Sequence, residues 1–366
     1  MRKIGFIINY PLQNQIDTGT LDVLKVSFEN ALNSFGEVHV FSTKDNHPPE
    51  HYQLGDKIKV HTIPRRFPSV FGVFDEYLRI KKIVQQENLS LLRAFIPLSA
   101  GLISVRIGKA LRIPVIVSIH GDRVQTERLQ GMNRFEAIKN WLRSYVLRNA
   151  NVVPVITEDM KQYALRFGVP KDKIVKHPNF VDTNKFQPPA FVKDYGLIMY
   201  VGRLSKEKKL DVFIKAIKKV KNKLRVRYQI IGEGPERENL ERLVKELHLE
   251  KNVFFNGKIS HEDLPTHYHA NSLFLGGGGF SVIEAQSCGL PVITYKLEGA
   301  KDLILKNKTG FLCDLDPTLI AEKVRLLLTN TELRNKMSRT ARKWAVKKFS
   351  LESFKKREQD FYRRFT

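Results

Sequence analysis

Short β-branched segments alternate with longer amphipathic segments along most of this chain, and the series runs twice. Strands that alternate with helices need right-handed crossovers, and these produce parallel sheets with helices on both faces. The strand-like segments before residue 189 are KIGFIIN (3–9), EVHVFS (37–42), IKVHTIP (58–64), LLRAF (91–95), PVIVSIH (114–120) and VVPVI (152–156). The series restarts with LIMYVG (197–202), RYQIIG (227–232), VFFNG (253–257), SLFLG (272–276) and PVITY (291–295). The sequence therefore predicts an α/β protein made of two doubly wound domains.

The connection between the two series sets the expected domain boundary. A proline-containing stretch at 189–195 separates them, and 366 residues suit two domains of ordinary size. We expect a first domain at 1–188 and a second at 189–349, with the carboxyl ends of their strands facing across a cleft. The last segment, 350–366, begins with a plausible cap at Ser350, and we expect it to form a helix that joins the first domain.

The composition restricts the class of protein. A hydrophobic fraction of 42% excludes a mainly disordered chain, and no apolar run approaches the roughly 20 residues that span a bilayer. The first residues are typical of a strand rather than a signal peptide, so we expect a cytoplasmic protein. Cys288 and Cys313 have no metal-ligand spacing, which predicts buried free thiols.

The net charge of +24 indicates a protein attracted to phosphates. The charge is +10 before residue 189 and +14 after it, so no single basic tail explains it.

A basic loop follows the first strand-like segment of the second series. In VGRLSKEKKLDVFIKAI (201–217) the strand ends at Gly202, which allows a tight turn, and the loop then runs into a helix. Arg203 offers a planar fork that suits phosphate oxygens, and Lys208 adds a compact positive charge. We expect these two residues to bind a phosphate group. The alternative is a solvated basic loop, because further lysines follow in the helix.

Four consecutive glycines form a second candidate site in FLGGGGFSVIEAQSCGLPVI (274–293). Without β-carbons, this loop can bring backbone N–H groups and a helix N-terminus close to an anion. Glu284 lies about one turn into the following helix, placed to accept hydrogen bonds from two neighbouring sugar hydroxyls. These features point to the phosphates and ribose of a nucleotide, although a structural turn would also explain the glycines.

Together these segments resemble the retaining GT-B glycosyltransferases of the glycosyltransferase family 4 type, the glycosyl transferases group 1, and the resemblance covers nearly the whole chain. It is most specific at 197–314. The family's Gly-Arg-Leu-spacer-Lys pattern is similar to 202–208, its Gly-x-Gly-Pro element to IIGEGPERENL (230–240), and its base-facing loop to FFNGKIS (254–260). The second glutamate of its paired-glutamate motif falls on Glu284.

The resemblance implies two Rossmann-like domains and transfer of a hexosyl group from a nucleoside-diphosphate sugar to an acceptor hydroxyl, with retention and without a metal or other cofactor. The acceptor would be a glycan, a glycolipid or a small molecule. The donor contacts that it implies come from Gly202, Gly234, Lys258, Ile259, Gly277, Gly279, Phe280, Ser281 and Glu284. Arg203 and Lys208 would stabilise the charge that develops on the leaving diphosphate.

The first domain matches the family less tightly. IPVIVSIHGD (113–122) resembles the strand that delivers an active-site histidine, which would make His120 catalytic, although a structural histidine is the alternative. Gly19, Asp122 and Glu158 are candidates for the acceptor side. Asp122 and Glu158 would instead cap the next helices if they have no role in binding.

One position departs from the family in a way that affects the donor. The first glutamate of the paired motif, which contacts the transferred sugar in relatives, is replaced by Gly276. A glycine cannot supply this contact, so the sequence leaves the sugar and the catalytic competence open.

Three other classes of protein remain alternatives. A nucleic-acid-binding protein would explain the charge, but the chain has no recognised binding motif of that kind, and we expect no nucleic-acid partner. A non-catalytic nucleotide-sugar-binding protein would explain Gly276. A GT-B enzyme of another reaction type, such as an epimerase or a phosphorylase, would have the same fold but catalyse a different reaction.

A basic stretch in the first domain suggests a membrane surface. Residues 106–148 carry nine basic and three acidic side chains, and RFEAIKNWLRSYVLRN (134–149) is amphipathic, with Trp141 and Tyr145 among its large residues. Helices that lie on anionic membranes have such patterns, so peripheral attachment at the inner face of a membrane is one hypothesis. The alternative is an ordinary core-packed helix with a solvated face.

Overall fold

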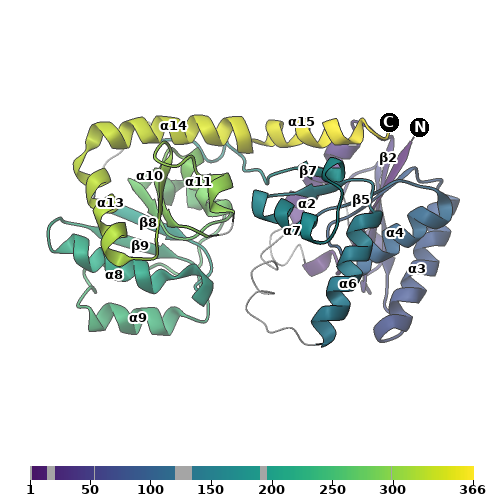
Figure 1. Ribbon diagram of the computed structural model, residues 1–366, viewed down its shortest axis with the longest axis horizontal. Coiled ribbons are helices and arrows are strands. Elements are labelled where there is room, and N and C mark those ends of the chain that lie inside the picture. The colour runs from purple at the N-terminus through teal and green to yellow at the C-terminus, as the bar shows by residue number, and fades with distance from the viewer. Residues whose placement is uncertain (1, 15–20, 53, 120–133, 190–195, 298) are drawn as a thin grey trace. The chain divides into compact units, whose positions relative to one another are not determined.

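The computed structural model describes residues 2–14, 21–52, 54–119, 134–189, 196–297 and 299–366 (Figure 1). The chain forms two compact units. Unit 1 comprises Met1–Pro178 and Lys355–Thr366, and unit 2 comprises Asn179–Phe354.

Unit 1 is built around a five-stranded parallel sheet with the strand order β3-β2-β1-β4-β5. Beyond β5, the strands β6 and β7 pair with each other in parallel. Its elements in chain order are β1 (Lys3–Ile8), α2 (Leu21–Ala31), β2 (Glu37–Thr43), η1 (Pro49–His51), β3 (Ile58–Ile63), α3 (Ser69–Gln86), β4 (Leu91–Ala94), α4 (Ser99–Leu111), β5 (Val115–Val117), α6 (Arg134–Asn149), β6 (Val153–Val155), α7 (Glu158–Arg166), η2 (Lys171–Lys173) and β7 (Ile174–Lys176).

Both faces of this sheet are covered by helices because side chains alternate along each strand. In β1, Ile7 faces a core with residues of α3, α4 and α6, whereas Phe6 and Ile8 face a second core with residues of α2 and the C-terminal helix. These strands carry apolar residues on both faces, which is the pattern expected of a parallel sheet.

The C-terminal helix α15 (Leu351–Tyr362) completes the second of these cores. The buried guanidinium of Arg93, on β4, donates to Glu358 Oε1 and to the Tyr362 hydroxyl, each at 2.5 Å. Its Cζ atom also lies 4.9 Å from the centre of the Phe95 ring and 5.3 Å from that of Phe361. Glu358 further accepts a hydrogen bond from Asn30 Nδ2 at 2.8 Å. The predicted return of the last segment to the first domain therefore has a specific anchor.

Unit 2 contains a six-stranded parallel sheet with the order β10-β9-β8-β11-β12-β13. Its elements are β8 (Leu197–Val201), η3 (Lys206–Lys208), α8 (Leu210–Lys221), β9 (Arg227–Ile231), α9 (Arg237–Glu246), β10 (Val253–Phe255), α10 (Leu264–Ala270), β11 (Leu273–Leu275), α11 (Phe280–Ser287), β12 (Val292–Tyr295), α12 (Ala300–Leu303), β13 (Gly310–Cys313), α13 (Pro317–Thr329) and α14 (Thr331–Phe349). Ser350 follows α14 and caps α15 as expected, since its Oγ accepts from the N–H of Ser353 at 3.2 Å.

The two units divide before residue 188, because the residues that follow Pro178 pack into unit 2. Val181 and Phe186 belong to the core of unit 2. Arg342, on α14, donates to the carbonyls of Thr183 at 2.8 Å and Phe186 at 2.9 Å. The proline-containing stretch at 189–195 therefore lies beyond the point where the chain enters unit 2.

Each strand-like segment named above contains an observed strand, and two further short strands, β7 and β13, lie outside them. Cys288 and Cys313 are buried free thiols, as predicted. Burial, and then the charge of Glu284, raise the pKa of the Cys288 thiol, which keeps it protonated.

Candidate functional site

The strand order of unit 2 reverses between β8 and β11. From β8 the chain proceeds to β9 and β10 on one side, whereas β11, β12 and β13 follow on the other. In open α/β sheets, ligands bind outside the carboxyl ends of the strands at such a reversal. The basic loop that begins at Gly202 and the glycine loop that begins at Gly276 leave β8 and β11 at this position.

Close backbone contacts hold the basic loop against the loop that follows β9. The N–H of Gly202 donates to Ile231 O at 3.0 Å, and the N–H of Leu204 donates to Glu233 O at 2.9 Å. A β-carbon on Gly234 would lie 2.3 Å from the carbonyl oxygen of Leu204, so only glycine allows this approach. Gly202 and Gly234 therefore shape the site at the carboxyl edge of the sheet.

Arg203 and Lys208 provide positive charge at this edge. Lys208 ends the short helix η3, and its Cδ lies 3.3 Å from the position that a β-carbon on Gly277 would occupy. The structure thus brings the basic loop and the glycine loop together. In the described part of the chain, neither the guanidinium of Arg203 nor the ammonium of Lys208 has a hydrogen bond or ion pair. Both groups are available to an anion.

The glycine loop leads directly into α11. Gly279 is the N-cap of this helix, has a φ of 101°, and provides no side chain to cap the first N–H groups. The next residues are Phe280, whose side chain is 42% exposed, and the half-buried Ser281. An uncapped helix N-terminus next to Lys208 favours a negatively charged ligand.

The surroundings of Gly276 leave no space for a side chain at this position. Its φ is 154°, and a β-carbon there would lie 2.3 Å from Cδ2 of Tyr200. Tyr200 is itself fixed, since its hydroxyl donates to Arg203 O at 3.0 Å and its ring is buried. This position therefore has no room for the glutamate that the family usually carries.

Glu284 is buried and held by two partners that the sequence analysis did not identify. The hydroxyl of Tyr268 donates to Glu284 Oε2 at 2.8 Å, and His261 Nε2 lies 3.0 Å from Glu284 Oε1. Burial, and then the charge of Glu284, raise the pKa of Tyr268 well above its usual value, so Tyr268 remains a donor. The carboxylate keeps lone pairs for further donors, because two oxygens can accept about four hydrogen bonds. In the sequence, Tyr268 lies between His267 and His269, and no local pattern marks it as a partner of Glu284.

Lys258 and Ile259 follow β10 at the same edge of the sheet. Lys258 is exposed, and Ile259 is half-buried against the core of unit 2. The N–H of Gly232 donates to Gly257 O at 2.7 Å, which ties this loop to the end of β9. The loops after β8, β9, β10 and β11 thus gather the predicted donor-side residues at one edge of one unit.

The acceptor-side candidates lie in unit 1 or outside the described residues. Glu158 begins α7 and pairs with Lys161 at 3.1 Å and Lys176 at 3.5 Å. The cap of α7 is instead Thr157, whose side chain accepts from the N–H of Met160. His120, Asp122 and Gly19 fall outside the described residues.

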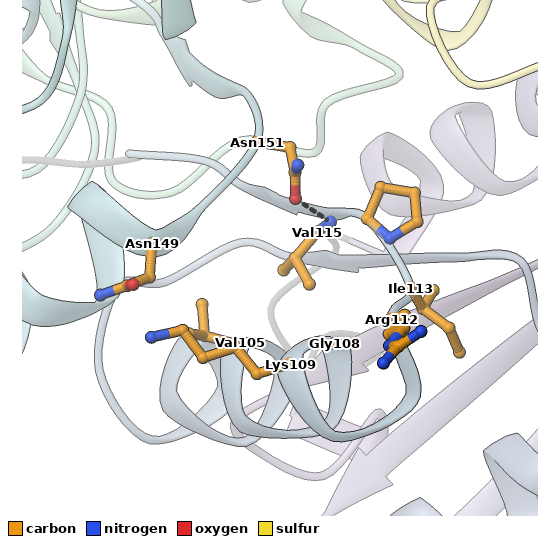
Figure 2. A pocket seen from close by; sticks show the side chains of 9 residues that line it. Val105, Gly108, Lys109, Arg112, Ile113, Val115, Asn149 and Asn151 are labelled. Carbon is orange, nitrogen blue, oxygen red and sulfur yellow. Dashed lines mark hydrogen bonds between the residues drawn. The ribbon is translucent and has the colours of Figure 1, made fainter.

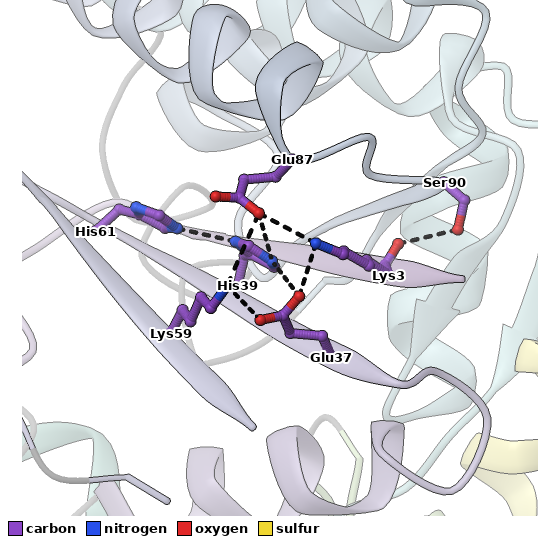
Figure 3. Close-up of polar contacts among 7 residues, drawn as sticks. All are labelled: Lys3, Glu37, His39, Lys59, His61, Glu87 and Ser90. Carbon is purple, nitrogen blue, oxygen red and sulfur yellow. Dashed lines mark hydrogen bonds and ion pairs between the residues drawn. The ribbon is translucent and has the colours of Figure 1, made fainter. Parts of the chain in front are cut away.

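Within the described part of the chain, Glu37, His39 and Glu87 are close enough to one another to hold a metal ion (Figure 3). However, the ammonium of Lys3 lies 2.7 Å from Glu37 Oε2 and 3.1 Å from Glu87 Oε2, and that of Lys59 lies 2.5 Å from Glu37 Oε1. The hydrogen bonds from Lys3 and then Lys59 lower the pKa of Glu37 to about 2. Because both carboxylates are neutralised by lysines, we interpret this group as an ion-pair network that joins β1, β2 and β3.

The acidic pair Asp314 and Asp316 has the spacing of a metal-binding Asp-x-Asp motif, although the expectation of a metal-independent enzyme assumed that the chain has none. Asp314 pairs with Lys296 at 2.7 Å, and Asp316 caps α13 by accepting from the N–H groups of Thr318 and Leu319. Both carboxylates therefore have structural partners.

A cavity of about 340 Å³ lies in unit 1, between α4, the end of α6 and the start of β5 (Figure 2). Its polar lining comes from Lys109, Arg112, Asn149 and Asn151. The side chain of Asn151 accepts a hydrogen bond from the N–H of Val115 at 2.8 Å. The cavity lies at the amino end of β5 and includes none of the predicted site residues.

Comparison with protein families identifies the chain. Residues 181–344 match the model described as Glycosyl transferases group 1, and residues 30–185 match Glycosyltransferase Family 4. The chain is a GT-B glycosyltransferase of the family 4 type. The residues matched by the first model include the whole edge of unit 2 described above.

Characterised glycosyltransferases resemble this one over most of its length. It is 25% identical to N-acetyl-alpha-D-glucosaminyl L-malate synthase of Bacillus anthracis over 305 residues, which are 78% of this chain and 77% of the relative. It is 26% identical to the GalNAc-alpha-(1->4)-GalNAc-alpha-(1->3)-diNAcBac-PP-undecaprenol alpha-1,4-N-acetyl-D-galactosaminyltransferase of Campylobacter jejuni, with 93% of each chain covered.

Solved structures support the fold of this glycosyltransferase. Anabaena HepE, crystallised with UDP, superposes with a TM-score of 0.79, 16% identity and complete coverage of both chains. At this identity the likeness concerns the fold. None of the helices in the described segments is both long and apolar enough to cross a bilayer.

Proposed function

We propose that this glycosyltransferase transfers a hexosyl group from a nucleoside-diphosphate sugar to an acceptor hydroxyl, with retention and without a metal. The observation that carries the proposal is the convergence of Arg203, Lys208 and the uncapped start of α11 at the strand reversal of unit 2. This arrangement suits a diphosphate, and Glu284, about one turn into the same helix, offers a carboxylate to ribose hydroxyls. The complexes of HepE with UDP and with UDP-glucose support a donor of this class.

In the proposed reaction, the acceptor hydroxyl attacks the anomeric carbon, and the bond from that carbon to the diphosphate oxygen breaks. Negative charge then grows on the diphosphate, where Arg203, Lys208 and the N–H groups at the start of α11 stabilise it. The departing phosphate takes the proton of the acceptor on the same face of the sugar. Fixed cations supply the charge stabilisation that a divalent ion provides in other enzymes, so we expect turnover to persist in EDTA.

The test is incubation with a panel of nucleotide sugars, with and without glycan, glycolipid and small-molecule acceptors. Release of nucleoside diphosphate together with a new glycoside supports transfer. Donor binding without release would instead favour a non-catalytic nucleotide-sugar-binding protein. A product of inverted configuration would contradict the retaining mechanism.

A variant tests the assignment of the phosphate site. Lys208→Ala should lose most turnover and keep its fold, because the ammonium has no structural partner in the described chain. Lys206→Ala, in the same short helix, is the matched control, since Lys206 carries the same charge but is exposed, whereas Lys208 is half-buried next to the glycine loop. Equal turnover of the two variants would show that Lys208 does not act on the diphosphate.

We also propose that the enzyme attaches peripherally to an anionic membrane and works on a lipid-linked acceptor at its inner face. The helix α6 exposes Ile138 (63%) and Trp141 (66%), which is unusual for a core-packed helix. The relative from Campylobacter jejuni is named for an undecaprenol-linked substrate, which is consistent with such an acceptor.

A further inference from the structure

A row of large apolar side chains lies exposed along α3 and the residue before its cap. We call it the α3 stripe. It comprises Phe67 (53% exposed), Phe71 (77%), Phe74 (59%) and Leu78 (49%). The spacing of three and four residues places Phe71, Phe74 and Leu78 on one face of the helix, and Phe67 lies just before its start. The opposite face carries the buried residues Ile80 and Val84, which pack into the core of unit 1. The helix therefore has two apolar faces. One packs into the core, and the other, the α3 stripe, is exposed and is not needed for packing.

The exposed residues of α6 lie on a helix of the same layer. The helices α3 and α6 both pack against α4, and their first turns lie at the lower end of unit 1 in Figure 1. The most exposed residues are in the first half of each helix, namely Phe71 and Phe74 on α3 and Ile138 and Trp141 on α6. The ring of Trp141 stacks on Tyr145 with 6.1 Å between centroids. Aromatic side chains of this kind are favoured at the interface between lipid and water.

Cations lie at both ends of the α3 stripe. Arg66 is exposed and directly precedes Phe67, and Lys82 is exposed one turn after Leu78 on the same face. The part of the chain before residue 189 carries a net charge of +10. An apolar row bounded by cations complements a bilayer with anionic headgroups, where rings enter the acyl boundary and cations remain at the phosphates.

We propose that the α3 stripe inserts into the headgroup and acyl boundary of an anionic bilayer, together with the exposed side chains of α6. This proposal rests on the membrane attachment proposed above and adds its mode, which is insertion of side chains rather than electrostatic adsorption alone. Insertion removes apolar surface from water, and salt does not screen that contribution. The first half of α3 would thereby hold unit 1 at the surface from which a lipid-linked acceptor is presented.

The experiment compares the full-length protein with Phe71→Ser/Phe74→Ser on vesicles of phosphatidylcholine with and without phosphatidylglycerol. The matched control is Phe254→Ser, which removes a side chain that is 42% exposed on unit 2. The unmodified protein should bind the anionic vesicles and retain part of its binding at high salt. The double variant should bind about tenfold or more weakly and lose the salt-resistant part, because two buried rings contribute more than the free energy of a tenfold change. Trp141 supplies a second readout, since its emission should shift to the blue on vesicles and do so less in the variant.

Three results would overturn the proposal. The first is that the unmodified protein does not bind the vesicles, and the second is that the double variant binds them as well as the unmodified protein does. The third is that the double variant loses a dimer but still binds the vesicles, which would make the stripe an interface between copies of the chain. Turnover on a water-soluble acceptor separates this proposal from the catalytic one. The double variant should turn over this acceptor as fast as the unmodified protein does. If neither protein turns it over, the result contradicts the proposed transfer reaction and not the proposed insertion.

Discussion

Alanine at Gly276 should destabilise the protein far more than alanine at Gly279, although both replace a glycine in the same loop. Both positions have a positive φ, 154° and 101°, that side chains rarely adopt. Strain of this kind costs about 1–3 kcal/mol. Only Gly276 adds a collision, because its β-carbon would lie 2.3 Å from the buried ring of Tyr200, whereas nothing lies within 4 Å of a β-carbon on Gly279. Overpacking a core adds about 1–3 kcal/mol, so we expect Gly276→Ala to cost about 2–6 kcal/mol in total.

The assay is urea unfolding of both variants, followed by circular dichroism. The free energy of unfolding should fall by about 1–3 kcal/mol for Gly279→Ala and by clearly more for Gly276→Ala. Equal losses would show that Tyr200 moves aside without cost, and would refute the argument that this ring excludes a side chain. In that case Gly276→Glu would become a reasonable way to restore the sugar contact of the family. With the structure as described, it would disrupt the end of β11 instead.

Three further predictions follow from named contacts. Glu284→Ala should weaken binding of nucleoside diphosphate in calorimetry while Glu284→Asp weakens it less, and unchanged affinity would remove the ribose assignment. Glu358→Ala should lower the free energy of unfolding by about 3–5 kcal/mol, because Arg93 stays buried without its carboxylate; Arg93→Met together with Glu358→Leu should cost much less, and an equal cost would contradict this reason. Lys3 and Lys59 lower the pKa of Glu37 from 4.5 to about 2, so its stabilisation is complete above pH 4.5 and is lost as the pH falls toward 2. Glu37→Gln should therefore be less stable at pH 7 and lose less on acidification, as urea unfolding at pH 7 and pH 3 would reveal.

The alternation of strands and helices was sufficient to predict the fold class, since it depends on local periodicity. The boundary between the units was not predictable in this way. The sequence at 189–195 has the composition of a connection, but Phe186 and Val181 already pack into unit 2. That assignment depends on Arg342, which lies far along the chain and donates to the carbonyl of Phe186. No local pattern contains this information.

The candidate site divides in the same way. Arg203 and Lys208 lie in the loop after β8, and Glu284 lies in the helix that follows β11, so their placement at one edge could be predicted from topology. The partners of Glu284 could not, because Tyr268 and His261 come from a separate segment and meet Glu284 only in the folded unit. From the sequence, the missing glutamate at Gly276 left the sugar and the catalytic competence open, whereas the structure relates the glycine to the ring of Tyr200, which fills the space.

The split composition of unit 1 affects how the protein is made. Arg93 leaves the ribosome long before Glu358 and Tyr362, and all of unit 2 is synthesised between them. Until the last helix emerges, a guanidinium destined for the interior has no carboxylate, and the face formed by Phe6 and its neighbours lacks its cover. All of unit 2 is therefore available to fold before unit 1 is complete. A premature stop within α15 would leave unit 1 incomplete, although nearly all of the sequence of unit 1 would have been translated.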